Sequence, residues 1–203
     1  PEGEVTATNQ DTDKPDMTTT TFLRLVLDYA DDLDEAVEIA QSYDMHDSAG
    51  TSYHYMVADA SGRSAIFEWV AADDDTDTDG SARELRVTYN DDDAAFGEVE
   101  AAADYQWVTN FVLEPNYYAS DDAKKGLDRY NELYTRLSAT DGIVADESAA
   151  MDVLAAVGRR SWNNDDANTI TVHSVVYNLT DRVMYWVPNE NFDDASAWIT
   201  YKL

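Results

Sequence analysis

The spacing of apolar residues predicts two helices close to the start of the chain. Residues 1–16 are polar, show no periodicity, and are expected to form an extended surface segment. Residues 18–21 then offer threonine hydroxyls that can cap a helix beginning near Phe22. Asp34 is expected to cap a second helix, whose apolar positions run from Ala36 to Ala40. We expect the pair to form a helical hairpin lying on a sheet.

Strand patterns follow, interrupted by two further helical patterns. The β-rich residues Tyr53–Ala58 and Ser64–Val70 flank the turn Asp59–Gly62, which predicts an antiparallel hairpin. Helical spacing returns at Leu127–Leu137 and at Glu147–Val157. The other expected strands are Glu84–Tyr89, Tyr105–Val112, Thr169–Tyr177, Arg182–Val187 and Ala197–Leu203.

This order of elements predicts an α+β fold. Antiparallel hairpins with helices packed on their outer faces form layered domains, and the two blocks of strands suggest two stacked sheets. Neither an internal repeat nor a long linker divides the chain, so residues 1–203 are expected to form a single domain. The hairpin Tyr53–Val70 and the strand ending at Asn110 are expected to be neighbours in one sheet.

Composition narrows the classes of partner. The content of 44% hydrophobic and 11% aromatic residues is typical of a folded chain. The 42 acidic and 13 basic residues give a formal net charge of -29, which repels nucleic acids and anionic membranes. No apolar run approaches the roughly 18 residues that span a bilayer. The acidity fits either solubility through self-repulsion or adaptation to high salt, and it does not identify the compartment.

Salt is expected to stabilise this protein. Because a net charge of -29 makes the folded chain repel itself, shortening the Debye length should raise the free energy of unfolding. The midpoint of thermal unfolding should therefore rise between low and molar sodium chloride. A flat or falling midpoint would contradict both this expectation and the adaptation to high salt.

Four segments carry a resemblance to a known family. In chain order they are His54-Tyr55-Met56-Val57-Ala58-Asp59-Ala60-Ser61-Gly62-Arg63, Trp107-Val108-Thr109-Asn110-Phe111, Leu127-Asp128-Arg129-Tyr130 and Ser174-Val175-Val176-Tyr177-Asn178-Leu179-Thr180-Asp181. Together they resemble the later part of the choloylglycine hydrolase (linear amide C–N hydrolase) family. That family includes bile salt hydrolases and penicillin V acylases and belongs to the N-terminal-nucleophile hydrolases. The resemblance implies an αββα sandwich whose N-terminal part is missing from this sequence.

The resemblance also implies a reaction. In the family, a cysteine at the mature N-terminus attacks a linear, non-peptide amide, and its α-amine acts as the base. The implied substrate is a small N-acyl amide, such as a conjugated bile salt or penicillin V, and no cofactor is required. This chain has no cysteine, so it is expected to be inactive without the N-terminal segment of the same enzyme. A homo-oligomer is compatible with the sequence.

Two residues match positions of the family's site. Asn110 matches the asparagine of a Thr-Asn pair whose side chain supports the substrate amide and its oxyanion. Arg129 matches an arginine near the catalytic cysteine. The alternatives are a strand-end amide that bonds backbone groups and a solvated helix arginine. Arg136 competes with Arg129 for the same match.

Other candidates lead to weaker hypotheses. Asp75–Gly80 reproduces the first half of a calcium-binding loop, but position twelve is Arg86 instead of a bidentate glutamate. A solvated acidic hairpin loop is the alternative. The three histidines do not share a metal-like spacing, and His54 and His173 lie inside expected strands, where they would be packed or hydrogen-bonded. No Gly-x-Ser-x-Gly sequence supports a serine nucleophile.

Two functions of other classes remain open. The chain could be a non-catalytic relative that keeps the fold to bind a ligand, or an acidic calcium-binding surface domain. A cysteine after an initiator Met or cleavage site in the upstream reading frame would favour the enzyme. Calorimetry with calcium against magnesium would test the calcium-binding domain.

Overall fold

The computed structural model describes residues 7–71, 79–91, 105–113, 124–162 and 169–203. Contacts divide the chain into two compact units, Pro1–Leu127 and Asp128–Leu203. Each unit has its own three-stranded antiparallel sheet. A single domain over residues 1–203 stays a prediction.

The helical hairpin of the first unit forms as expected, but its second cap differs. Helix α1 spans Thr19–Tyr29 and is capped by the Thr18 side chain. Helix α2 spans Leu33–Ser42, and its cap is Asp32, whose carboxylate accepts a hydrogen bond from the Glu35 N–H at 3.0 Å. The prediction of Asp34 as the cap was wrong, because Asp32 has the extended backbone that an N-cap requires and Asp34 already lies in the first turn.

The first sheet confirms the predicted hairpin. Strands β3 (His54–Ala58), β4 (Ser64–Ala71) and β5 (Arg83–Tyr89) pair antiparallel in the order β3-β4-β5. The turn between β3 and β4 closes through the Asp59 N–H, which donates to the Arg63 carbonyl at 3.0 Å. Gly62 in this turn has a φ of 91°, a conformation that favours glycine.

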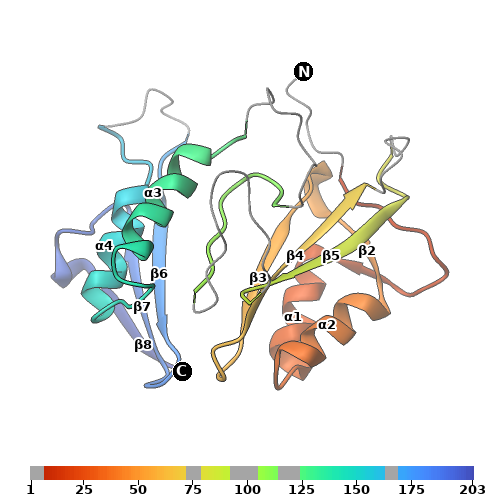
Figure 1. Ribbon diagram of the computed structural model, residues 1–203, viewed down its shortest axis with the longest axis horizontal. Helices are drawn as coiled ribbons and strands as arrows, with labels where there is room; N and C mark the ends of the chain where they lie inside the picture. Colours follow the sequence, from red (N-terminus) through yellow and green to blue (C-terminus); the bar gives the residue numbers. More distant parts are fainter. Residues whose placement is uncertain (1–6, 72–78, 92–104, 114–123, 163–168) are drawn as a thin grey trace. The chain divides into compact units, whose positions relative to one another are not determined.

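Helices α1 and α2 cover one face of this sheet (Figure 1). Side chains alternate between the two faces of a strand, so every second residue of β3 and β4 faces these helices. Phe22 of α1 lies at the centre of the core and is fully buried. Its ring contacts those of Tyr55, Phe67 and Trp69 at centroid distances of 4.9, 5.8 and 5.7 Å.

Two short strands in this unit were not predicted. Strand β1 (Asp16–Thr18) pairs in parallel with β2 (Asp44–His46). Each has three residues, too few for a period-two pattern to be recognised in the sequence.

In the segment 1–16, which the sequence predicts to lie extended at the surface, Asn9 and residues 11–16 are exposed, but two side chains are not. Thr8 and Gln10 are buried. The Gln10 side chain accepts from the Met45 N–H at 3.0 Å and donates to the Arg83 carbonyl at 2.7 Å. This amide therefore joins β2 to β5, a use of a polar residue that hydrophobic periodicity does not reveal.

The expected strand Tyr105–Val112 is not a strand. The described residues 105–113 have no ladder with β3, β4 or β5, so the predicted sheet neighbour of the hairpin was wrong. The physical reason is that side chains bind its backbone instead. The Thr109 carbonyl contacts the His54 ring, and the Leu113 N–H donates to the Glu68 carboxylate. The acidic, alanine-rich residues Asp91–Ala103, which the sequence predicts to form a surface loop, lie outside the described residues apart from Asp91.

The second unit agrees with the prediction. It contains helices α3 (Leu127–Ser138) and α4 (Glu147–Val157). Its strands β6 (His173–Asn178), β7 (Val183–Pro188) and β8 (Ile199–Lys202) pair antiparallel in that order. Met151 of α4 packs with Val187 and Phe192 in a buried cluster.

Short 3-10 turns lie at Ser48–Gly50 in the first unit and Ala195–Ala197 in the second. Within the described ranges, no helix has the length and apolarity needed to cross a membrane.

Candidate functional site

Residues 105–113 cross the face of the first sheet that is opposite α1 and α2 (Figure 1). Gln106 makes the first contact. Its side chain accepts from the Ser64 hydroxyl and donates to the Thr88 carbonyl, both at 2.9 Å. His54 and Glu68 make the next two contacts, with Thr109 and Leu113. The segment is therefore held along the sheet by side-chain hydrogen bonds.

Asn110 is an exposed residue in this otherwise well-packed segment. Trp107, Phe111 and Leu113 are 7%, 5% and 4% exposed, whereas Asn110 is in the exposed class. The hydroxyl of Thr109 donates to the Gly126 carbonyl at 3.1 Å. A solvent-accessible amide on a backbone held by its neighbours suits the role of an oxyanion donor, since such a donor must be oriented before the reaction.

His54 and Glu68 face each other across β3 and β4. They are partners in the antiparallel register, and the His54 Nδ1 lies 3.2 Å from a Glu68 carboxylate oxygen. The Glu68 side chain is 2% exposed and the His54 side chain 18%. The His54 Nε2 lies 2.6 Å from the Thr109 carbonyl oxygen. Because a carbonyl only accepts, Nε2 must carry a proton.

Arg129 lies in the first turn of α3 and is half-buried. Burial lowers the pKa of its guanidinium, and the nearby charge of Arg159 lowers that pKa further, whereas Asp128 raises it. Arg136, by contrast, is an exposed residue that donates to Glu132 at 2.7 Å, one turn away. The two arginines that compete for the same match therefore differ in burial, since Arg129 is half-buried and Arg136 is exposed.

The two predicted site residues lie in different units. Asn110 belongs to Pro1–Leu127 and Arg129 to Asp128–Leu203. The surroundings of each residue are compatible with its predicted role, and both roles stay predictions.

The other residues that the sequence suggested as metal or catalytic candidates make local structural contacts or lie in strands. Most of Asp75–Gly80 lies outside the described residues; within the remainder, Asp79 accepts hydrogen bonds from Ser81 in a tight turn. Arg86, at the twelfth position of that loop, lies 3.2 Å from Glu84. Over the described ranges, no group of three or more His, Cys, Asp or Glu side chains could hold a metal ion. His54 and His173 lie in β3 and β6, as expected.

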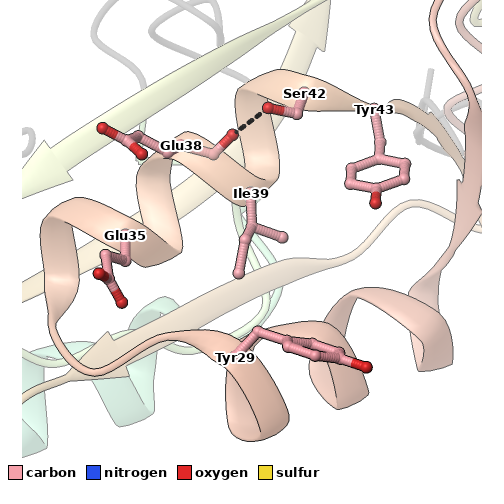
Figure 2. Close-up of a pocket in the computed structure, with 6 residues that line it drawn as sticks. All are labelled: Tyr29, Glu35, Glu38, Ile39, Ser42 and Tyr43. Atoms are coloured by element: carbon pink, nitrogen blue, oxygen red, sulfur yellow. Dashed lines mark hydrogen bonds between the residues drawn. The ribbon is translucent and has the colours of Figure 1, made fainter.

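A shallow groove of about 330 Å³ lies between α1 and α2. Figure 2 shows Tyr29 from α1 on one side and residues of α2 on the other. The lining residues are Tyr29, Glu35, Glu38, Ile39, Ser42 and Tyr43. Neither Asn110 nor Arg129 lines it, so this groove is separate from the predicted site residues.

Comparison with solved structures identifies the class of fold. Two variants of the conjugated bile acid hydrolase from Clostridium perfringens superpose on 98% of this chain and 71% of theirs. Their TM-scores are 0.57 and 0.56, and the sequence identity is 15% for each. The fold is therefore that of the N-terminal-nucleophile hydrolases, an α+β fold of helices and antiparallel sheets, as the sequence predicted.

The family follows from the sequence itself. Residues 8–192 match the family described as acyl-coenzyme A:6-aminopenicillanic acid acyl-transferase, and the chain belongs to this family. Together with the likeness to bile acid hydrolases, this confirms the predicted kinship with choloylglycine hydrolases. No curated protein sequence matches the chain.

Sequence reasoning missed the role of Glu68, although a signal was present. Glu68 is the only charged residue in the apolar run Ala65-Ile66-Phe67-Glu68-Trp69-Val70. A charge in a strand that is buried on both faces needs a partner, and His54 lies directly opposite on the neighbouring strand.

Proposed function

We propose that this chain supplies most of an amide-bond hydrolase in which Asn110 stabilises the oxyanion and a cysteine outside this sequence is the nucleophile. The reaction is cleavage of a linear, non-peptide C–N amide of a small N-acyl compound. The observation that carries the proposal is the exposed amide of Asn110 on a backbone held at Thr109 and Leu113. The family and the fold support this reaction class.

In the proposed reaction, a cysteine outside this sequence is the nucleophile, and this chain supplies the group that stabilises the oxyanion. The α-amine of the cysteine takes the thiol proton, and the thiolate attacks the amide carbon. The resulting ammonium group gives that proton to the leaving amine as the C–N bond breaks and a thioester forms. Water then hydrolyses the thioester. Both steps pass through a tetrahedral oxyanion, and a positioned amide N–H lowers the barrier because it binds that charge more strongly than the ground-state carbonyl.

Arg129 is proposed to bind an anionic part of the substrate or intermediate. Its guanidinium is half-buried and repelled by Arg159, so an anion at this position would relieve an unfavourable charge distribution. An arginine can hold a carboxylate through two parallel hydrogen bonds. Conjugated bile salts and penicillins both carry a carboxylate or a comparable acid group.

A second candidate is acyl transfer to an amine instead of water. The family description favours it, because it names an acyl-transferase that acts on 6-aminopenicillanic acid. In that reaction the cysteine thiolate would displace coenzyme A from an acyl-coenzyme A, and the resulting thioester would then react with the amine of the acceptor. Supplying the full-length enzyme with an acyl-coenzyme A and 6-aminopenicillanic acid, and measuring the acylated amine against the free acid, would separate transfer from hydrolysis.

Activity is expected to depend on the cysteine segment. The 203-residue chain should hydrolyse neither penicillin V nor a glycine-conjugated bile salt, because it contains no thiol. The full-length enzyme with a processed N-terminal cysteine should release the free acid from at least one of them, and exchange of that cysteine for alanine should abolish the release. Thiol-independent hydrolysis by the 203-residue chain would contradict the mechanism. Substrate binding without turnover by the full-length protein would favour a ligand-binding relative.

A further inference from the structure

We propose that His54 and Glu68 are positioning residues that fix the orientation of Asn110; this inference rests on the function proposed above for that amide. The two side chains act through the backbone on either side of Asn110, at the Thr109 carbonyl and the Leu113 N–H.

The first contact fixes the peptide plane that leads into Asn110. The His54 Nε2 donates to the Thr109 carbonyl oxygen at 2.6 Å. This carbonyl and the Asn110 nitrogen belong to one planar peptide unit. A hydrogen bond to the carbonyl therefore restricts the rotation that would turn the Asn110 side chain away from a substrate.

The second contact fixes the end of the segment. The Leu113 N–H donates to both Glu68 carboxylate oxygens, at 2.9 and 3.0 Å. One of these oxygens also faces the His54 Nδ1 at 3.2 Å. A single carboxylate thus holds Leu113 and orients the imidazole that holds Thr109.

The hydrogen bonds of the His54 ring are compatible with one another. Since Nε2 carries a proton, Nδ1 either donates its own proton to a carboxylate or accepts the proton of a neutral Glu68 carboxyl. In both cases one proton lies between the two side chains, and the contacts with Thr109 and Leu113 are kept. The imidazole is therefore held in the orientation that serves the Thr109 carbonyl.

Fold stability alone does not explain well why a carboxylate and an imidazole are paired at this position. Burying a carboxylate and an imidazole costs desolvation energy that their attraction often fails to recover, and apolar residues of similar size are often as stabilising. Positioning is a stronger reason, because a displacement of about 1 Å can reduce catalysis by about 100-fold. The residues between the two contacts carry no strand ladder with the first sheet that could do this instead.

A double-mutant cycle in the full-length enzyme tests the inference. His54→Phe keeps a ring but removes both nitrogens, and should lower kcat by about 10-fold or more while KM changes less than about twofold. In an Asn110→Ala background, the same substitution should cause almost no further loss.

Glu68→Leu should behave like His54→Phe. Glu68→Gln should recover most of that loss, because its amide can accept from Leu113 and donate to Nδ1. The matched control is His173→Phe, an exposed histidine in β6.

The outcomes separate the two proposals. If Asn110→Ala leaves kcat unchanged, the function proposed for Asn110 fails. If Asn110→Ala lowers kcat but His54→Phe has no effect, or costs the same in both backgrounds, only the positioning inference fails.

A measurement on the unmutated protein tests the inference even if the variants do not fold. With ¹⁵N-labelled histidine, these 203 residues contribute three imidazoles to the spectrum. His54 should show a protonated Nε2, and the Leu113 amide should exchange slowly with solvent. An unprotonated Nε2 or a rapidly exchanging Leu113 amide would overturn the inference without any measurement of activity.

Discussion

Replacing Asn110 with alanine in the full-length enzyme is expected to lower kcat by about 100-fold, the usual loss for one oxyanion donor, or about 2.7 kcal/mol. KM should change much less, because the hydrogen bond strengthens mainly as charge develops on the substrate oxygen. Asn110 is exposed, so the substitution should leave the fold intact. Steady-state kinetics with penicillin V or a glycine-conjugated bile salt, whichever is turned over, provides the measurement.

The matched control for this experiment is Asn131→Ala. Asn131 is another exposed asparagine, in α3, and it has no proposed role. Its replacement should leave kcat within about twofold, as is usual for surface substitutions. Equal kcat values for the Asn110→Ala and unmutated enzymes would remove Asn110 from the site, although the fold and family assignments would stand.

Phe22→Ala is expected to destabilise the first unit by about 3–5 kcal/mol, the range for a large aromatic residue removed from a core. Phe22 is completely buried, and its ring contacts three other aromatic rings from β3 and β4. Truncation would leave a cavity that the flanking strands cannot fill without breaking their ladder. Urea unfolding followed by tryptophan fluorescence should show the loss, because Trp69 contacts the Phe22 ring.

Leu23→Ala is the control, because it changes the next residue of the same helix. Leu23 is 46% exposed, and its truncation should cost less than about 1 kcal/mol. Helix propensity differs little between the two experiments, since both place alanine in α1. Similar losses for the two variants would show that the aromatic cluster is not the centre of this unit's core.

Local patterns were sufficient for most of the secondary structure. Helices α3 and α4 and the β3–β4 hairpin follow from apolar periodicity and turn residues that lie close together in the sequence. The cap of α2 shows where such patterns become ambiguous. Asp31, Asp32 and Asp34 all have capping side chains, and only the backbone conformation shows that Asp32 is the cap.

Around Asn110, by contrast, the local sequence pattern predicts the wrong secondary structure. The sequence Tyr105–Val112 has strong strand propensity, yet contacts with distant residues override it. Propensity describes how side chains fit a pleated surface, and it cannot report that His54 and Glu68 will bind the backbone of residues 109–113. Gln10 is a similar case, since its role depends on β2 and β5 lying beside it.

The sequence by itself determined the acidic character, the absence of a thiol, the order of most helices and strands, and the resemblance that led to Asn110 and Arg129. These properties are local or additive along the chain. Tertiary structure alone decided that residues 105–113 cross a sheet face without joining the sheet, and that the buried Glu68 carboxylate lies against the partly buried His54 ring. It also showed that Arg129 is half-buried and Arg136 exposed. The physical reason is that desolvation and hydrogen bonding between distant residues depend on the surroundings that only the folded chain creates.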